Sequence, residues 1–267
     1  MPLSQLIVLA IIQGLTEFLP ISSSGHLALV DELTGWADQG VLIDMAIHVG
    51  SLFAVLIYFR KDVLELFGGA WMLLRGEMTE AGRLVLYLVG ASVPIFVVGF
   101  AVVSSGLVDG LRGAATIAWA NMIFALLLYW GDRAGGTSRT LREMSWGQAL
   151  IIGLSQIAAI MPGASRSGVT MTAARFLGFD RKEAARFSML LAIPTILGAG
   201  AATALELIES GNTTLQTDAV IAAFLSFLAA WLSIAVFMRL LENISLTPFV
   251  IYRVVLGAAL LGWLYLG

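Results

Sequence analysis

The chain has 267 residues, of which 59% are apolar and only 12% charged, and its mean hydropathy is +0.91. This composition excludes a water-soluble globular protein and indicates an integral membrane protein. A net charge of -3 without any basic tract excludes nucleic acid as a partner, and the absence of cysteine excludes disulfides and thiolate chemistry.

The first apolar stretch runs from Gln5 to Leu19 and stops at Pro20. As a helix it would be about 22 Å long, which is shorter than the roughly 30 Å of a bilayer core. Its start has neither a basic region nor a small-residue cleavage site, so we expect it to belong to the mature protein rather than to a signal peptide. A second short stretch, Gln148 to Met161, stops in the same way at Pro162.

Six other apolar stretches are long enough to cross a bilayer as helices. They are residues 41–59, 84–103, 113–130, 187–205, 219–238 and 248–266. A polar, glycine-containing segment follows each short stretch, ISSSGH or GASRSG, and apolar sequence then resumes. Non-helical backbone at this depth is tolerated only inside the protein or beside a wet cavity. We therefore predict one all-α integral membrane domain over residues 1–267, with six transmembrane helices and two re-entrant helix-loop-helix hairpins.

The basic residues are unevenly divided between the connecting segments. Loops 60–83, 131–147, 175–186 and 239–247 hold twelve of the fifteen Lys and Arg, whereas segments 1–4, 29–40, 104–112 and 206–218 hold only Arg112. The positive-inside rule therefore places the first set in the cytoplasm.

The two short stretches are also related to each other. A fixed offset of 143 residues aligns Gln5 with Gln148, Gln13 with Gln156, Ser22 with Ser165, Ser24 with Ser167 and Gly25 with Gly168. Because three spans separate the copies, we predict inverted repeats over residues 1–130 and 144–267. Such an arrangement would bring both hairpin tips to one site near the midplane.

Ionisable residues inside a bilayer cost at least about 2.5 kcal/mol each at the centre of a helix, so they indicate function. The first hairpin holds Glu17 and His26, and the second holds Arg166. An arginine fork and the N–H groups of Gly/Ser turns at helix starts bind phosphate oxygens, which predicts a phosphorylated ligand. The residues expected to bind it are Ser22, Ser24, Gly25, Ser165, Ser167, Gly168 and Thr170, with Ser23 and Gly163 beside them.

A divalent cation is the expected cofactor. Glu17 and Gln13, one helical turn apart, offer the oxygen ligands that Mg²⁺ or Ca²⁺ prefers. His26 can carry a proton near neutral pH, and a neighbouring serine can attack phosphorus. These roles outline hydrolysis of a phosphate ester or anhydride. Five other polar residues are expected to be structural, with His48 the weaker catalytic candidate of the two histidines: Asp44, His48, Asn121, Gln156 and Arg186.

Two segments, QGLTEFLPISSSGH at residues 13–26 and PGASRSGVT at 162–170, resemble the signatures of the bacitracin-resistance type of undecaprenyl-diphosphate phosphatase. The resemblance continues through RFSMLLAIP at 186–194 and PFVIYR at 248–253. It implies hydrolysis of the C55 isoprenyl diphosphate to its monophosphate, with a divalent cation, at a site open to the periplasm. Such a reaction recycles the lipid carrier of peptidoglycan synthesis and confers bacitracin resistance.

The resemblance also implies roles for single residues. Glu17 matches the second acid of an acidic pair, and Gln13 stands where many members have Glu, so one carboxylate fewer is available to a metal. Residues that match the family's catalytic centre are Ser23, His26, Ser165, Arg166 and Thr170. Either Ser23 or His26 could attack phosphorus, and the resemblance leaves both open.

A transporter or flippase of the isoprenyl phosphate lipid is the alternative, because inverted repeats with broken helices are common in transporters. A carrier needs groups that bind phosphate, but it does not need a nucleophile, a proton donor and a metal ligand together. In either case we expect a multi-pass protein of the bacterial cytoplasmic membrane, surrounded by membrane lipid. Monomer and homodimer are both open.

Overall fold

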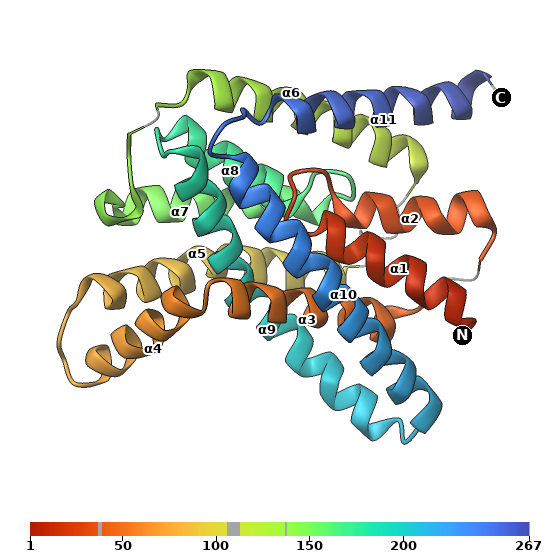
Figure 1. Cartoon of the computed structure of the whole chain (residues 1–267), viewed down its shortest axis with the longest axis horizontal. Coiled ribbons are helices and arrows are strands. Elements are labelled where there is room, and N and C mark those ends of the chain that lie inside the picture. The colour runs from red at the N-terminus through yellow and green to blue at the C-terminus, as the bar shows by residue number, and fades with distance from the viewer. Residues whose placement is uncertain (37–38, 106–112, 137, 267) are drawn as a thin grey trace.

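A computed structural model describes residues 1–36, 39–105, 113–136 and 138–266, and the regular elements in these ranges are helices (Figure 1). Six of them are long and apolar enough to cross a membrane, which confirms the predicted number of spans. The chain is therefore a multi-pass membrane protein. The six helices are α3 (Val41–Tyr58), α5 (Glu80–Ser104), α6 (Ala114–Ala134), α9 (Arg181–Glu209), α10 (Thr213–Leu240) and α11 (Thr247–Leu266).

Shorter helices form at both predicted breaks. Around Pro20 the chain forms α1 (Leu3–Thr16) and α2 (Ser23–Thr34). Around Pro162 it forms α7 (Trp146–Ser155), a 3₁₀ turn η3 (Gln156–Ile160) and α8 (Arg166–Phe176). In both pairs the chain doubles back, and the two turns lie near each other in the middle of the bundle (Figure 1). The re-entrant placement of these pairs in a membrane stays a prediction, as do the inverted repeats.

Two details differ from the sequence-based expectation. The first short helix ends at Thr16 rather than at Leu19, in keeping with the steric bias of Pro20 against a helical residue before it. The carbonyl of Leu19 accepts a hydrogen bond from Ser167 of the other turn. Residues 60–83, expected to be a loop, contain α4 (Arg60–Leu74), which packs on α5. The expected outer segments 29–40 and 104–112 include residues 37–38 and 106–112, and therefore Arg112, which lie outside the described residues.

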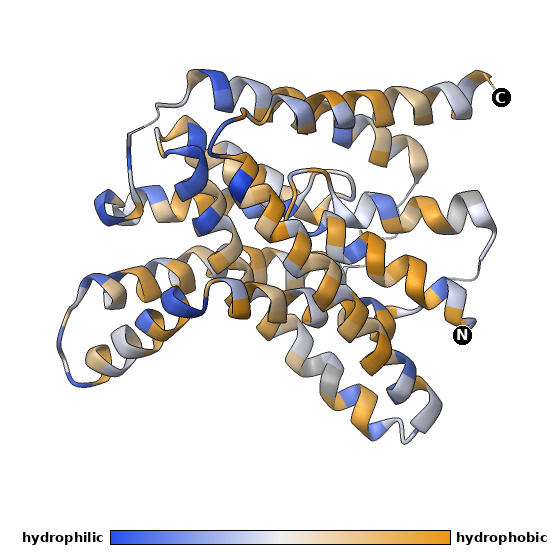
Figure 2. Ribbon diagram, in the orientation of Figure 1, coloured by the Kyte–Doolittle hydropathy of each residue, from blue (hydrophilic) through white to orange (hydrophobic). Residues whose placement is uncertain are grey.

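The basic segments gather at one end of the bundle. The start of α4, the 3₁₀ turn η2 (Leu141–Glu143), the start of α9 and the α10–α11 connection lie together, opposite the N-terminus and the α9–α10 turn (Figure 1). Hydrophilic residues are dense at this end, while hydrophobic ones cover most helix surfaces (Figure 2). Buried Asp132 of α6 links helices within this basic end, because its carboxylate accepts hydrogen bonds from Arg175 of α8 at 3.1 Å and from Arg181 of α9 at 2.7 Å.

One arginine holds the two turns together. Arg253 of α11 is fully buried, and its guanidinium donates to Pro20 O at 3.2 Å in the first turn. It also donates to Gly163 O at 2.9 Å and to Ala164 O at 3.0 Å in the second turn. Its remaining Nε donates to Asn121 Oδ1 at 2.7 Å, and the Asn121 amide in turn donates to Arg253 O. The predicted structural role of Asn121 is therefore confirmed.

Replacing Arg253 by lysine should lower the thermal stability of the detergent-purified protein. A single ammonium cannot reach both turns and Asn121, so at least one buried carbonyl loses its donor, at a cost of about 1–3 kcal/mol each. The unfolding midpoint Tm, followed by tryptophan fluorescence, should therefore fall clearly in Arg253→Lys. Exposed Arg239 is the matched control, and Arg239→Lys should keep the wild-type Tm. An equal Tm in the two variants would contradict the bridging role.

Candidate active site

The two turns have the same backbone geometry. Ser22 and Ser165 have positive φ angles, 73° and 71°, and no other non-glycine residue in the described ranges has one. A serine rarely adopts this conformation, which costs on the order of 1–3 kcal/mol and is found mostly at functional sites. Each serine caps the helix that follows it, since Ser22 Oγ accepts from Gly25 N and Ser165 Oγ accepts from Gly168 N. Two serines that lie 143 residues apart therefore cap the following helices in the same way.

Two helix N-termini begin at these turns. The first N–H groups of α2 and of α8 have no acceptor within their own helix, and the aligned peptide dipoles make each N-terminus an anion-binding site. Gly163 allows the second turn to pack closely, because a Cβ there would lie 2.5 Å from Ile117 O. The backbone thus presents positive potential from two directions before any charged side chain is considered.

Glu17 is the centre of the polar contacts between the turns. Its carboxylate is buried and accepts from Ser23 Oγ at 2.6 Å and from Gln13 Nε2 at 2.9 Å. Arg166 Nη2 donates to its other oxygen at 2.9 Å, which forms an ion pair between the turn after α1 and the start of α8. His48 of α3 brings Nε2 to 3.6 Å from the carboxylate. Each turn therefore supplies one member of a charged pair.

A cavity of about 270 Å³ opens at this pair. Five of the residues predicted for catalysis or binding line it, and so do His48 and Gln156. Its other walls come from α3, α5, η3 and α9 and are apolar apart from Thr195. The predicted residues in its lining are Glu17, Ser23, Ser24, Ser165 and Arg166.

The remaining predicted binding residues lie beside the cavity without lining it. Ser167 donates to Leu19 O at 2.8 Å, and Thr170 Oγ1 is 2.7 Å from Ser188 Oγ. Gly25 and Gly168 donate their N–H groups to the capping serines. In the structure these residues stabilise the conformation of the two turns through hydrogen bonds. They are Ser22, Gly25, Ser167, Gly168 and Thr170.

His26 does not face the cavity, contrary to the expectation that it would line it with Glu17 and Arg166. Its ring stacks on Tyr252 of α11 with an interplanar angle of 3°, and Nε2 is 2.6 Å from the tyrosine hydroxyl. Nδ1 is 2.7 Å from Ser22 O and must donate, because a carbonyl only accepts. Both ring nitrogens are thus engaged on the side of the turn that faces α11.

His48 is the residue that sequence reasoning underrated. It lines the cavity, and its Nδ1 donates to Asp44 O at 2.7 Å, which turns Nε2 towards Glu17. The signal that could have found it is an ionisable side chain in the middle of a membrane span. Gln156 also lines the cavity, and its predicted interhelical hydrogen bond is confirmed by a contact of 3.2 Å between Nε2 and Ala91 O.

The donor set for a cation is small. Within the described ranges no three His, Asp or Glu side chains lie close enough together to hold a metal ion by themselves. Among the described residues that line the cavity, Glu17 is the one carboxylate, and the buried Oε1 of neighbouring Gln13 has no hydrogen-bond partner. A hard divalent cation commonly takes one or two carboxylates and completes its shell with phosphate oxygens and water. Glu17, Gln13 Oε1 and Ser23 fit that pattern, because all three offer oxygen.

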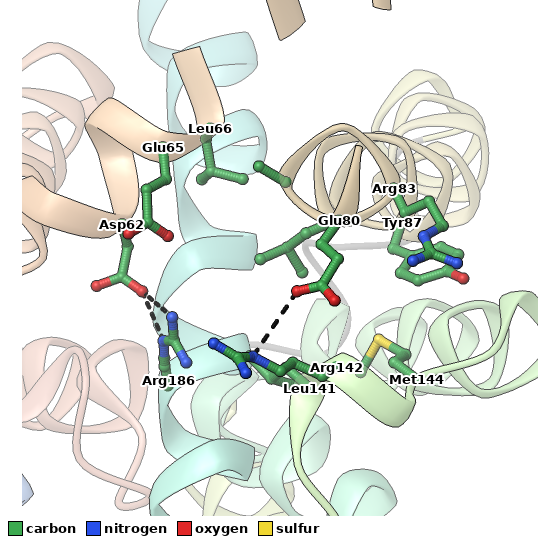
Figure 3. A pocket seen from close by; sticks show the side chains of 12 residues that line it. Asp62, Glu65, Leu66, Glu80, Arg83, Tyr87, Leu141, Arg142, Met144 and Arg186 are labelled. Carbon is green, nitrogen blue, oxygen red and sulfur yellow. Dashed lines mark hydrogen bonds and ion pairs between the residues drawn. The ribbon is translucent and has the colours of Figure 1, made fainter. Parts of the chain in front are cut away.

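A second cavity of about 160 Å³ lies at the basic end, between α4, α5, η2 and α9 (Figure 3). Its charges largely neutralise one another. Arg186, expected to anchor the helix at the interface, pairs there with Asp62, and Arg142 lies 3.7 Å from Glu80. None of the predicted catalytic or binding residues lines it. The cavity at Glu17 is therefore the candidate active site.

Comparisons with known proteins show which family the chain belongs to. The family model described as bacitracin resistance protein BacA matches residues 6–259. A protein named undecaprenyl-diphosphatase from Maricaulis maris is 50% identical over 264 residues, which cover 98% of each chain. Proteins with the same name from Dinoroseobacter shibae and Chromohalobacter salexigens are 49% and 46% identical and cover 98% and 97% of their own lengths, and 98% and 96% of this chain. A match of this length and identity means that the chain belongs to the family of bacitracin resistance protein BacA.

Proposed function

We propose that the protein hydrolyses undecaprenyl diphosphate to undecaprenyl phosphate and inorganic phosphate, and so recycles the lipid carrier of peptidoglycan synthesis. The names of its relatives support this substrate. The observation that carries the proposal is structural: two helix N-termini and Arg166 converge on one cavity beside a serine that is hydrogen-bonded to a buried carboxylate. Positive potential would bind the diphosphate, and the Ser23–Glu17 pair would supply a nucleophile and its base.

Ser23 is the better placed of the two candidate nucleophiles. Its hydroxyl lines the cavity and donates to Glu17 at 2.6 Å, whereas His26 is turned towards Tyr252. The Ser23 oxygen would bond to the terminal phosphorus, and the bond from that phosphorus to the bridging oxygen would break. Glu17 would take the serine proton and pass it to the departing lipid phosphate. Water would then attack the phosphorus of the phosphoserine. Glu17 would take a proton from this water and give it to the departing Ser23 oxygen, which releases inorganic phosphate. A proton-carrying role for His26 stays a prediction.

Arg166 would change partners during this cycle. In the structure it neutralises Glu17, and a bound diphosphate would compete for the same guanidinium. Transfer of Arg166 to the phosphate oxygens would leave Glu17 a stronger base at the moment when the Ser23 proton must leave. Glu17 and Gln13 are the residues that would hold a divalent cation, whose charge would supply further neutralisation of the phosphates.

A lipid carrier without hydrolysis is the weaker proposal. A transporter site needs the positive groups that bind phosphate, but it gains nothing from a serine hydroxyl held at 2.6 Å from a carboxylate. This contact therefore favours the hydrolase.

We propose the bacterial cytoplasmic membrane as the location, with the basic end in the cytoplasm and the active site open to the periplasm. The charge distribution supports this orientation. Met45 and His48 of the cavity lie in the first half of α3, away from the basic start of α4, which follows that helix. Association into a homodimer stays a prediction from the sequence.

Replacing Arg166 by alanine should abolish phosphate release from an isoprenyl diphosphate, and Arg166→Lys should lose most of it. An ammonium cannot make the planar two-point contact with phosphate oxygens, and loss of one such donor costs about 10²–10³ in rate. His48→Ala should have an intermediate effect, because it removes a contact to Glu17 but no phosphate donor. Phosphate release by purified, folded protein measures all three, and wild-type turnover by Arg166→Ala would rule out the proposed centre.

The same assay in sealed vesicles tests the orientation. With a short, water-soluble isoprenyl diphosphate added outside, right-side-out vesicles should release phosphate and inverted vesicles should not. Release by inverted vesicles alone would reverse the proposed orientation.

The cation requirement should respond in opposite directions to two substitutions. Glu17→Gln removes the only carboxylate among the described residues that line the cavity, and should raise the Mg²⁺ or Ca²⁺ concentration that half-saturates the protein. Gln13→Glu should lower it, because a second carboxylate beside Glu17 increases the charge attracting a divalent ion. Calorimetric titration of each purified variant with each cation gives both values without turnover, which Glu17→Gln should lose together with its base. An unchanged cation requirement in both variants would exclude this pair as the ligands.

A further inference from the structure

An apolar groove begins next to the active-site cavity. It lies between α9 and α10 with α3 as its floor, and has a volume of about 180 Å³. Met45 of α3 lines both the groove and the cavity, so the two are neighbours. In sequence, Ala199 of the cavity is followed directly by Gly200 of the groove.

The side chains that line the groove are almost all apolar, so they would contact hydrocarbon. The exception is Thr203, whose hydroxyl donates to Ala199 O of its own helix at 3.2 Å. Gly200 creates part of the space, because a Cβ there would come within 2.8 Å of Val49 Cγ2. A methionine wall suits such a place, since its thioether side chain adapts to different packing.

On the α5 side of α9, Phe96 packs against Gly198, which precedes Ala199 of the cavity in sequence, and a Cβ at this glycine would lie 2.6 Å from the ring. A chain that left the cavity between α5 and α9 at this point would have to displace the ring.

We propose that this groove binds the isoprenyl tail of the substrate where it joins the diphosphate. The inference rests on the proposed function, because it takes the diphosphate to lie at Glu17 and Arg166. The groove is smaller than the roughly 300 Å³ at which drug-sized pockets begin, so it holds only the first isoprene units of a long chain. The rest of the tail lies in the bilayer, and selection acts on the units nearest the phosphate.

The test fills the groove and compares two substrates. Thr203→Trp should lower kcat/KM for farnesyl diphosphate about tenfold or more relative to isopentenyl diphosphate, which has a single isoprene unit, mainly by raising KM. Exposed Leu205 lies about 200° further round α9, so Leu205→Trp is the matched control and should keep the wild-type ratio. An unchanged ratio in Thr203→Trp, or the same change in both variants, would overturn the proposal.

Photolabelling separates failure of the groove from failure of the proposed function. A farnesyl diphosphate analogue that carries a benzophenone should label α3 around Met45 and Val49, and Thr203→Trp should abolish this labelling. The result does not depend on turnover, so it holds even if the wild-type protein released no phosphate, which would contradict only the hydrolase. Labelling confined to other helices, or suppressed equally well by an excess of phospholipid, would overturn the groove as an isoprenyl site.

Discussion

Broken helices inside a membrane protein leave carbonyl groups that need donors, and the structure depends on how this need is met. In hydrocarbon no water can satisfy a free carbonyl, so each must find a partner in the protein. Arg253 meets the need for both breaks at once, because its guanidinium donates to Pro20 in one turn and to Gly163 and Ala164 in the other. Because one side chain satisfies carbonyl groups of both turns, two parts of the chain that are distant in sequence lie together.

The charged pair of the active site follows from that contact. Glu17 comes from the first turn and Arg166 from the second, and either alone would be an unpaired buried charge, which is costly in a low-dielectric interior. In the proposed mechanism they stay paired until a diphosphate competes for the arginine. Binding and activation of the base are then one event in the proposed mechanism. The strained serines at Ser22 and Ser165 fit the same picture, since they aim two helix N-termini at the place where phosphate would bind.

Much of this could be predicted from sequence, because its causes are local. Span lengths, the breaks before Pro20 and Pro162, and the segregation of basic residues are properties of the chain itself, and the positions of Glu17, Ser23 and Arg166 at one cavity followed from the two short stretches. The direction of a side chain is not local. His26 meets Tyr252 and His48 meets Glu17 only once helices distant in sequence have packed together, so the sequence could not show which histidine lines the cavity.

The most direct test of the account is a structure of the protein with methylenediphosphonate, a non-hydrolysable diphosphate. The account predicts that its oxygens lie against the Arg166 guanidinium and the N-termini of α2 and α8, within reach of the Ser23 hydroxyl. Binding instead in the charged cavity between α4 and α5, at Arg142 and Arg186, would contradict it.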